Sequence, residues 1–197
     1  VACYARPGQK FTFFEIDPWI ERFARDAALF RYLSDCGKNA AMRLGDGRRS
    51  LLLAADGAFD LIILDAFSSD AIPVHLMTRE ALALYLRKLS KHGVIAIHIS
   101  NNFVDLEPVL AKLAQDANLT ARIQGHDPEE ANPTPEGKVS ALFASTWVVV
   151  ARRPSDLASL NDDARWKTLQ LNVKDRPWTD DYSNVFGQLI WTREFDS

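Results

Sequence analysis

The sequence has no excess of positive charge. Its 23 lysine and arginine residues are outnumbered by 26 aspartate and glutamate residues, and the formal net charge is -3 at pH 7. No basic stripe of the kind that binds nucleic acid is present. No apolar run approaches the ~18 residues of a membrane-spanning helix, and no segment has the pattern of a signal peptide. We therefore expect a cytoplasmic domain that does not bind nucleic acid.

Cysteine is scarce, with Cys3 and Cys36 its two occurrences among 197 residues. Their spacing fits neither a zinc site nor a Cys-x-x-Cys redox pair. We predict two thiols rather than a disulfide, in keeping with a reducing compartment. His75 and His98 have no neighbours at metal-ligand spacing, and we interpret both as structural. The sequence has no Gly-x-Ser-x-Gly elbow, which disfavours a hydrolase triad, and it predicts no bound metal.

Apolar strand patterns and helical patterns alternate along the chain. The strand pattern occurs within residues 10–18, 39–44, 59–64, 94–99, 119–124 and 146–151, and the helical pattern within 18–33, 49–54, 78–89, 106–117 and part of 160–171. This alternation predicts an α/β fold: a Rossmann-like, mostly parallel, doubly wound sheet with helices on both faces. The last two strands flank a polar loop and are expected to form an antiparallel hairpin at the edge. We expect one domain over residues 1–197.

Carboxylates follow three successive predicted strands. They are Glu15 and Asp17 after the first strand, Asp46 after the second, and Asp65 and Asp70 after the third. In open α/β sheets, ligands bind beyond the carboxyl ends of the strands, and an acid at such an end accepts hydrogen bonds from a ribose. Asp46 is flanked by glycines, which let the backbone approach a flat ring. Asp65 and Asp70 are placed to hold a cationic amine and to accept its proton.

Plainer interpretations of these acids stay open. Asp17 has the position of a helix N-cap, and a Gly-Asp-Gly segment such as the one around Asp46 is usually a turn. Asp65 and Asp70 could be turn residues, with Asp65 bonding to the backbone of the serines that follow it. For this pair taken alone the two interpretations are evenly balanced. We favour ligand binding for Glu15 and capping for Asp17, and three acidic strand ends together favour a cofactor site.

Three segments of the sequence are distinctive in combination. They are Thr12-Phe13-Phe14-Glu15-Ile16-Asp17-Pro18, Gly45-Asp46-Gly47, and the run from Leu64 to Pro73 (LDAFSSDAIP). Taken together, they resemble the spermidine synthase-like branch of the class I S-adenosylmethionine-dependent methyltransferases. A late loop from Thr179 to Ser183 (TDDYS) resembles the C-terminal signature of that branch. Its Asp180, Asp181 and Tyr182 either line the site or form a capped turn. The resemblance covers essentially the whole chain.

The resemblance implies a site for S-adenosylmethionine, or its decarboxylated form, as co-substrate. By position, Glu15 matches the ribose-binding acid, Asp46 the contact to the adenine amino group, and Asp65 the carboxylate that orients and deprotonates the attacking amine. Asp70 matches more loosely a second acid that binds the amine. The remaining residues implied are Asp17 and Gly47 for the cofactor, and Asp181 and Tyr182 for the substrate.

The reaction implied is transfer of an aminopropyl group from decarboxylated S-adenosylmethionine to a small-molecule amine. Two alternatives stay open: methyl transfer from S-adenosylmethionine to another acceptor, and a non-catalytic domain that binds a nucleoside or a partner protein. The first strand and glycine-rich loop of this branch have no counterpart in the sequence, so we expect an N-terminally incomplete domain. The resemblance is also compatible with a homodimer and with a parent protein attached to membrane segments.

Overall fold

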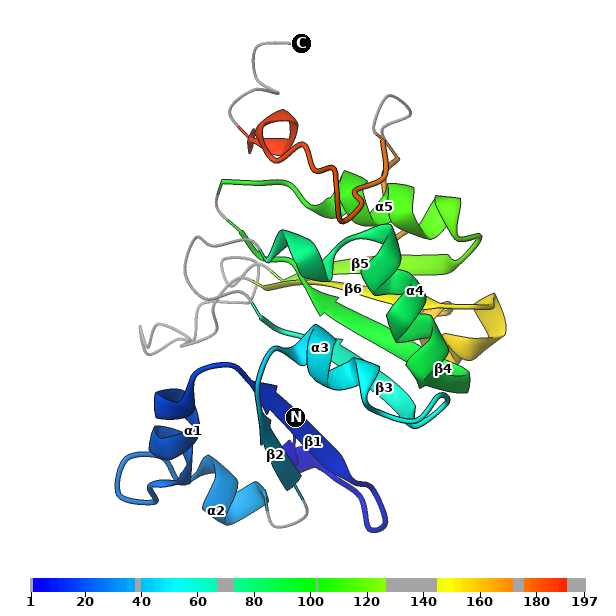
Figure 1. Cartoon of the computed structure of the whole chain (residues 1–197). Helices are drawn as coiled ribbons and strands as arrows, with labels where there is room; N and C mark the ends of the chain where they lie inside the picture. The colour runs from blue at the N-terminus through cyan, green and yellow to red at the C-terminus, as the bar shows by residue number, and fades with distance from the viewer. Residues whose placement is uncertain are drawn as a thin grey trace, which may run out of the picture. The chain divides into compact units, whose positions relative to one another are not determined.

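The computed structural model describes residues 2–37, 40–66, 73–101, 103–126, 145–171 and 176–190. The chain forms two compact units, Val1–Ala54 (unit 1) and Ala55–Ser197 (unit 2). Figure 1 labels the helices and strands of both units, and each unit is described by itself. The expectation of a single domain over residues 1–197 stays a prediction.

Unit 1 is built on a pair of parallel strands. The strands are β1 (Phe11–Glu15) and β2 (Ala40–Leu44), and the helices of the unit are α1 (Pro18–Arg25), α2 (Tyr32–Cys36) and α3 (Gly47–Leu52). Glu15 pairs with Leu44 in the register of the two strands. Both strands therefore end at the same edge of the sheet, each followed by the start of a helix.

The helix predicted over residues 18–33 is wrong beyond Arg25. Asp26 caps the end of α1, because its backbone N–H donates to the carbonyl of Phe23. Its carboxylate accepts from the backbone N–H of Ala28 at 2.9 Å. A short aspartate side chain that bonds to nearby backbone competes with helical hydrogen bonding, so the chain turns here before it resumes as α2.

A disulfide joins Cys3, in the 3-10 turn Ala2–Tyr4, to Cys36 at the end of α2. The prediction of two separate thiols is therefore wrong. The sequence spacing hid the pairing because the connection between the parallel strands β1 and β2 must return the chain to the edge where β1 begins. The two Cα atoms lie 4.6 Å apart across 33 positions. In the chain-entropy account, closing a loop of this length stabilises the fold by about 3–4 kcal/mol.

Unit 2 contains a four-stranded sheet with the strand order β3-β4-β6-β5. The strands are β3 (Phe59–Leu64), β4 (Leu89–His98), β5 (Thr120–His126) and β6 (Ser145–Ala151). Strands β3 and β4 are parallel, whereas β6 runs antiparallel to both β4 and β5. The predicted α/β fold with an antiparallel hairpin is confirmed, and β6 is inserted between β4 and β5.

Strand β4 begins at Leu89 rather than at Val94, where the sequence pattern places its start. The additional residues of the strand include Gly93. A Cβ atom at this position would lie 3.1 Å from the carbonyl oxygen of Phe59. Gly93 therefore allows a close approach of two neighbouring backbones inside the sheet, which is a common role of glycine within strands.

Helices α4 (Arg79–Lys88) and α5 (Glu107–Asp116) pack on one face of this sheet (Figure 1). Alternate residues of the central strands point to these helices, among them Ile95, Ile97 and Val148, all at most 3% exposed. The opposite face carries a smaller cluster formed by Val149, Ala151 and Leu157. Leu157 lies between two 3-10 turns, Pro154–Asp156 and Ala158–Leu160.

No helix forms over the described residues 161–171, contrary to the prediction for that segment.

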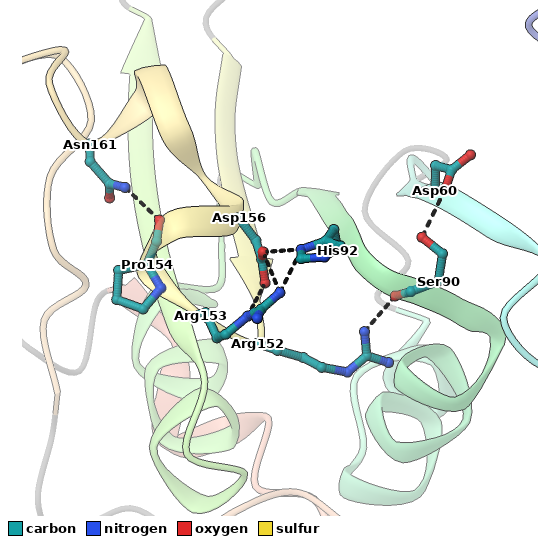
Figure 2. A network of polar contacts seen from close by, with 8 residues as sticks. All are labelled: Asp60, Ser90, His92, Arg152, Arg153, Pro154, Asp156 and Asn161. Carbon is teal, nitrogen blue, oxygen red and sulfur yellow. Dashed lines mark hydrogen bonds and ion pairs between the residues drawn. The ribbon is translucent and has the colours of Figure 1, made fainter.

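Side chains hold both ends of α4. At its N-terminus, Thr78 Oγ1 accepts from the backbone N–H of Ala81 at 3.1 Å. At its C-terminal end, the guanidinium group of Arg152 donates to the carbonyl of Leu86, in the last turn of the helix. It also donates at 2.6 Å to the carbonyl of Ser90, just beyond the helix (Figure 2). A cation at this end satisfies carbonyls that have no partner within the helix. Arg152, which directly follows β6, thereby ties the last described strand to α4.

A charged cluster next to Arg152 links the first half of β4 to the segment after β6 (Figure 2). His92 Nδ1 lies 2.8 Å from Asp156 Oδ1, and Arg153 Nε donates to Asp156 Oδ2 at 3.2 Å. The Asp156 side chain is 2% exposed. Hydrogen bonds from Arg153 and, after it, His92 lower the pKa of the Asp156 carboxyl below its ordinary value of 3.8.

We predict that Asp156→Asn removes a pH-dependent part of the stability of unit 2. The pKa of Asp156 is lower in the folded than in the unfolded protein. Its contribution is therefore fully present above the unfolded pKa of about 4 and is lost as the pH falls through the folded-state pKa. Urea unfolding at neutral pH and at about pH 3 should show a larger acid-induced loss of stability for wild type than for Asp156→Asn.

Asp162→Asn is the matched control for this experiment, because Asp162 is exposed in the same segment. It should follow wild type at both pH values. If wild type and Asp156→Asn lost the same stability on acidification, the ionic role of Asp156 would be contradicted.

Candidate functional site

In unit 1, the structure places Glu15 and Asp46 at neighbouring strand ends, as parallel pairing predicts. The carbonyl of Glu15 accepts from the backbone N–H of Gly45 at 2.8 Å, one residue before Asp46. Gly45 has a φ of +133°, a backbone conformation that favours glycine. It lets the chain turn from β2 into α3 and leaves both acids at the carboxyl edge of the two-stranded sheet.

The carboxylates at this edge also order their own backbone. Glu15 Oε1 accepts from the backbone N–H of Asp17 at 2.9 Å. Asp17 caps α1 by accepting from the backbone N–H two residues on at 2.8 Å, so the predicted capping role is confirmed. Asp46 caps α3, accepting from the backbone N–H of Arg49 at 2.8 Å, a helix cap where the plainer interpretation from the sequence was a turn. Contact with a cofactor stays a prediction for these three acids and for Gly47.

In unit 2, Asp65 and His98 lie at the same end of the sheet. Asp65 follows β3, and His98 is the last residue of the parallel strand β4. Asp65 Oδ1 lies 2.9 Å from His98 Nδ1, and His98 Nε2 lies 2.7 Å from Ser100 Oγ. The sequence reasoning missed this contact, since it interpreted His98 as structural. Strand register could have found it, because the ends of neighbouring parallel strands meet at one edge.

The imidazole of His98 is held in place by its surroundings. Its ring stacks on that of Trp147, with centroids 4.9 Å apart and planes inclined by 24°. Ser100 Oγ, at the far side of the ring, accepts from the backbone N–H of Thr146 at 2.7 Å. The side chain of His98 is 23% exposed and that of Asp65 is 59% exposed. A fixed imidazole therefore stands behind a carboxylate that a ligand can reach.

Asp70 lies outside the residues that the structure describes, together with the serines to whose backbone Asp65 was expected to bond. Its roles as a second catalytic acid and as an amine-binding residue stay predictions. For Asp65, the described contact is to the side chain of His98 rather than to the backbone of a turn.

The late loop of unit 2 is anchored to the start of α4. Asp180 Oδ1 accepts from the hydroxyl of Thr78 at 2.7 Å, and the backbone N–H of Asp180 donates to Glu80 Oε2 at 3.0 Å. Next to it, Asp181 is exposed, and the guanidinium group of Arg176 lies 4.6 Å from the ring centroid of Tyr182. Asp180 therefore anchors the loop to α4, and both interpretations of this loop stay open. Substrate binding by Asp181 and Tyr182 stays a prediction.

Within the described part of the chain, no three His, Cys, Asp or Glu side chains gather as metal ligands would. No helix among the described residues combines the length and the apolar character needed to cross a membrane. The side chains that the structure brings together at the end of β4 carry carboxylate, imidazole, hydroxyl and indole groups.

The fold is shared with solved enzymes of the Rossmann-like α/β type. A probable spermidine synthase from Corynebacterium glutamicum ATCC 13032 superposes with a TM-score of 0.57 at 15% identity, over 88% of this chain and 64% of that one. The spermidine synthase from Thermotoga maritima superposes with a TM-score of 0.50 at 16% identity, over 83% of this chain and 53% of that one. At these identities, the likeness shows the fold.

In sequence, the chain is similar to a polyamine aminopropyltransferase of Vibrio vulnificus (strain CMCP6), with 33% identity over 99 residues. That match spans 49% of this chain and 31% of the relative's length, and no family model matches. Together with the shared fold, it confirms the resemblance to the spermidine synthase-like branch that the sequence motifs carry.

We predict that Asp46→Ala destabilises unit 1 by about 1 kcal/mol, whereas Asp46→Asn leaves its stability near that of wild type. Alanine removes the oxygen that accepts from the backbone of α3, while asparagine keeps an equivalent acceptor. Urea unfolding of the three proteins checks this. An equal loss for both variants would show that the charge, rather than the cap, stabilises the turn. The asparagine variant then tests ligand binding without a change in fold.

Proposed function

We propose that the chain binds an adenosyl sulfonium co-substrate and transfers its aminopropyl group to a small-molecule amine. The observation that carries the proposal is Asp65, an exposed carboxylate at the carboxyl edge of parallel strands, with one oxygen held by His98. The resemblance of the sequence motifs and the similarity to a polyamine aminopropyltransferase support it. Methyl transfer and non-catalytic nucleoside binding are the alternatives that the experiments below distinguish.

The chemistry suits a carboxylate that can approach an amine. The amine nitrogen attacks the methylene carbon next to the sulfonium, so that a C–N bond forms while the C–S bond breaks. The electron pair of the broken bond neutralises the sulfur, which leaves as a thioether without help from an acid. An alkyl amine is mostly protonated at neutral pH and must lose a proton to attack. In this proposal, Asp65 attracts the amine, orients it and takes that proton.

The carboxyl edge of unit 1 is proposed to hold the nucleoside. Glu15 lies at the end of β1, the position from which an acid accepts hydrogen bonds from ribose hydroxyls in this class of fold. Asp46 and Gly47 follow β2 at the adjacent strand end. Asp17 and Asp46 cap the two helices that follow these strands. The backbone of both strand–helix turns is therefore ordered before a ligand binds, which reduces the entropic cost of binding.

Calorimetric titration with methylthioadenosine, S-adenosylmethionine and decarboxylated S-adenosylmethionine tests the co-substrate. Tighter binding of the decarboxylated form supports aminopropyl transfer, and tighter binding of S-adenosylmethionine favours methyl transfer. Binding of methylthioadenosine without turnover favours the non-catalytic alternative. Absence of binding to all three would contradict the proposal for this chain.

We predict that Glu15→Gln weakens the binding of methylthioadenosine by about 1.5–3 kcal/mol, the range for hydrogen bonds to charged groups. Glutamine keeps an oxygen that can accept from the backbone N–H of Asp17, so the strand end should stay ordered. Glu21→Gln, on the neighbouring helix α1 in an ion pair with Arg25, is the control and should bind as wild type does. An unchanged affinity for Glu15→Gln would remove Glu15 from the site.

We predict that Asp65→Asn lowers the turnover of decarboxylated S-adenosylmethionine with aliphatic diamines by about 10²- to 10⁴-fold. Asparagine can still accept the hydrogen bond from His98, but it cannot take up a proton. Binding of methylthioadenosine should therefore be largely preserved. Asp60→Asn, an exposed position on the same strand, is the control. Equal losses of turnover and nucleoside affinity in Asp65→Asn would sink the role proposed for Asp65.

A further inference from the structure

We infer that His98 is a positioning residue for Asp65. In this arrangement, His98 carries its ring proton on Nδ1 and donates it to Asp65 Oδ1, which leaves Asp65 Oδ2 as the atom that takes the proton of the amine. The inference rests on the proposed function, in which Asp65 is the proton acceptor, and it adds the residues that orient this acceptor: His98, Ser100, Thr146 and Trp147.

The direction of the hydrogen bonds follows from two groups whose roles cannot reverse: the carboxylate of Asp65, which only accepts, and the backbone N–H of Thr146, which only donates. The backbone N–H of Thr146 lies 2.7 Å from Ser100 Oγ, and a backbone N–H can only donate. Ser100 Oγ is thus an acceptor there, and its own hydroxyl proton is available for His98 Nε2 at 2.7 Å. When Nε2 accepts, the proton of a neutral imidazole resides on Nδ1. Nδ1 then donates to Asp65 Oδ1 at 2.9 Å.

The ring of His98 is fixed by the sheet as well as by these bonds. His98 pairs with Trp147 in the antiparallel register of β4 and β6, and the two rings stack. Beyond the strand end, the backbone N–H of Ile99 donates to the carbonyl of Thr146 at 2.9 Å. Thr146 therefore holds this strand end twice: its N–H bonds the Ser100 hydroxyl, and its carbonyl bonds the backbone of Ile99.

Asp65 gains a single orientation from this support. Its side chain is 59% exposed, and a carboxylate so exposed would sample several rotamers without a partner. The bond to His98 occupies Oδ1. Among the described residues, Asp65 Oδ2 has no hydrogen-bond partner. The amine proton would pass to Oδ2 as the C–N bond forms and the C–S bond breaks, while Oδ1 keeps its bond to His98.

The side chains of Asp65, His98 and Ser100 have the order of a serine hydrolase triad, with an acid, an imidazole and a hydroxyl in line. Ser100 differs from a nucleophile in its surroundings, because Oγ already accepts from the backbone of Thr146. That bond holds the hydroxyl against the sheet and takes one of its two lone pairs. The geometry therefore favours Ser100 as a support of His98 over Ser100 as an attacking group.

The tautomer of His98 can be measured without any assay of activity. The chain has four histidines, so long-range ¹H–¹⁵N spectra of the ¹⁵N-labelled protein can resolve each ring, and His98→Gln assigns the one of interest. We expect the proton of neutral His98 on Nδ1. A proton on Nε2 in wild type would overturn the inference, as would covalent labelling of Ser100 by a fluorophosphonate.

Two substitutions at His98 separate positioning from simple packing. The side-chain nitrogen of asparagine lies as many bonds from the backbone as Nδ1 does, so His98→Asn retains a donor for Asp65. The nitrogen of glutamine is one bond further out, near the place of Nε2, so His98→Gln does not. We expect kcat with a diamine to fall by about 10- to 100-fold in His98→Gln, with little change in the KM for the amine, and to recover in large part in His98→Asn.

His92→Gln is the control, since His92 lies in the first half of β4 in the separate cluster with Asp156; it should keep the kcat of wild type. Equal kcat values for His98→Gln and His98→Asn would overturn the positioning role, even if Asp65→Asn is inactive and the proposed function stands. If wild type turns over no amine, the proposed function and the catalytic part of this inference both fail. The tautomer then still decides whether the hydrogen-bond chain exists.

Discussion

Strand β4 is hydrogen-bonded along both of its edges, parallel to β3 and antiparallel to β6, and the candidate site of unit 2 depends on this double pairing. The register is well determined, because Ile95 and Ile97 are buried against the helices. A slip by one residue would turn both side chains to the other face of the sheet. The same register ends β4 at His98, with Asp65 beyond one neighbouring strand and Trp147 on the other.

Each half of β4 carries a histidine that contacts an aspartate from another segment, and the two pairs differ in which side chain is buried. In the first half, His92 is 66% exposed while Asp156 is 2% exposed and shared with Arg153. At the end of the strand the pattern is reversed, since Asp65 is 59% exposed and His98 is 23% exposed. The first pair therefore joins two segments of chain, whereas the second offers its carboxylate to a ligand. The contacts, rather than the residue types, separate a structural from a functional interpretation.

The acids of unit 1 show that a structural role and a binding role are compatible. Asp17 and Asp46 each cap a helix that starts directly after a strand. A capped turn of this kind places the preceding strand end at the edge where ligands of open α/β sheets bind. Capping therefore does not argue against a cofactor site, and it supplies the order that such a site needs.

Much of the fold was predictable because its elements follow local rules. The apolar run before Asp65 forms β3, and the helical spacing after Thr78 forms α4, each close to the predicted bounds. The errors arose where a side chain or a distant backbone overrides the local pattern. Asp26 ends α1 through its own hydrogen bond to the backbone of Ala28. Gly93 continues β4 because the backbone of Phe59 packs against it.

The sequence by itself determined the α/β class, the acids at the strand ends and the resemblance to spermidine synthase-like proteins, since these depend on residue types and short spacings. The tertiary structure decided which side chains meet: Cys3 with Cys36, and Asp65 with His98. Both contacts join residues about thirty positions apart, brought together by a chain reversal in one case and by strand register in the other. Periodicity along the chain records neither, because it describes one element at a time.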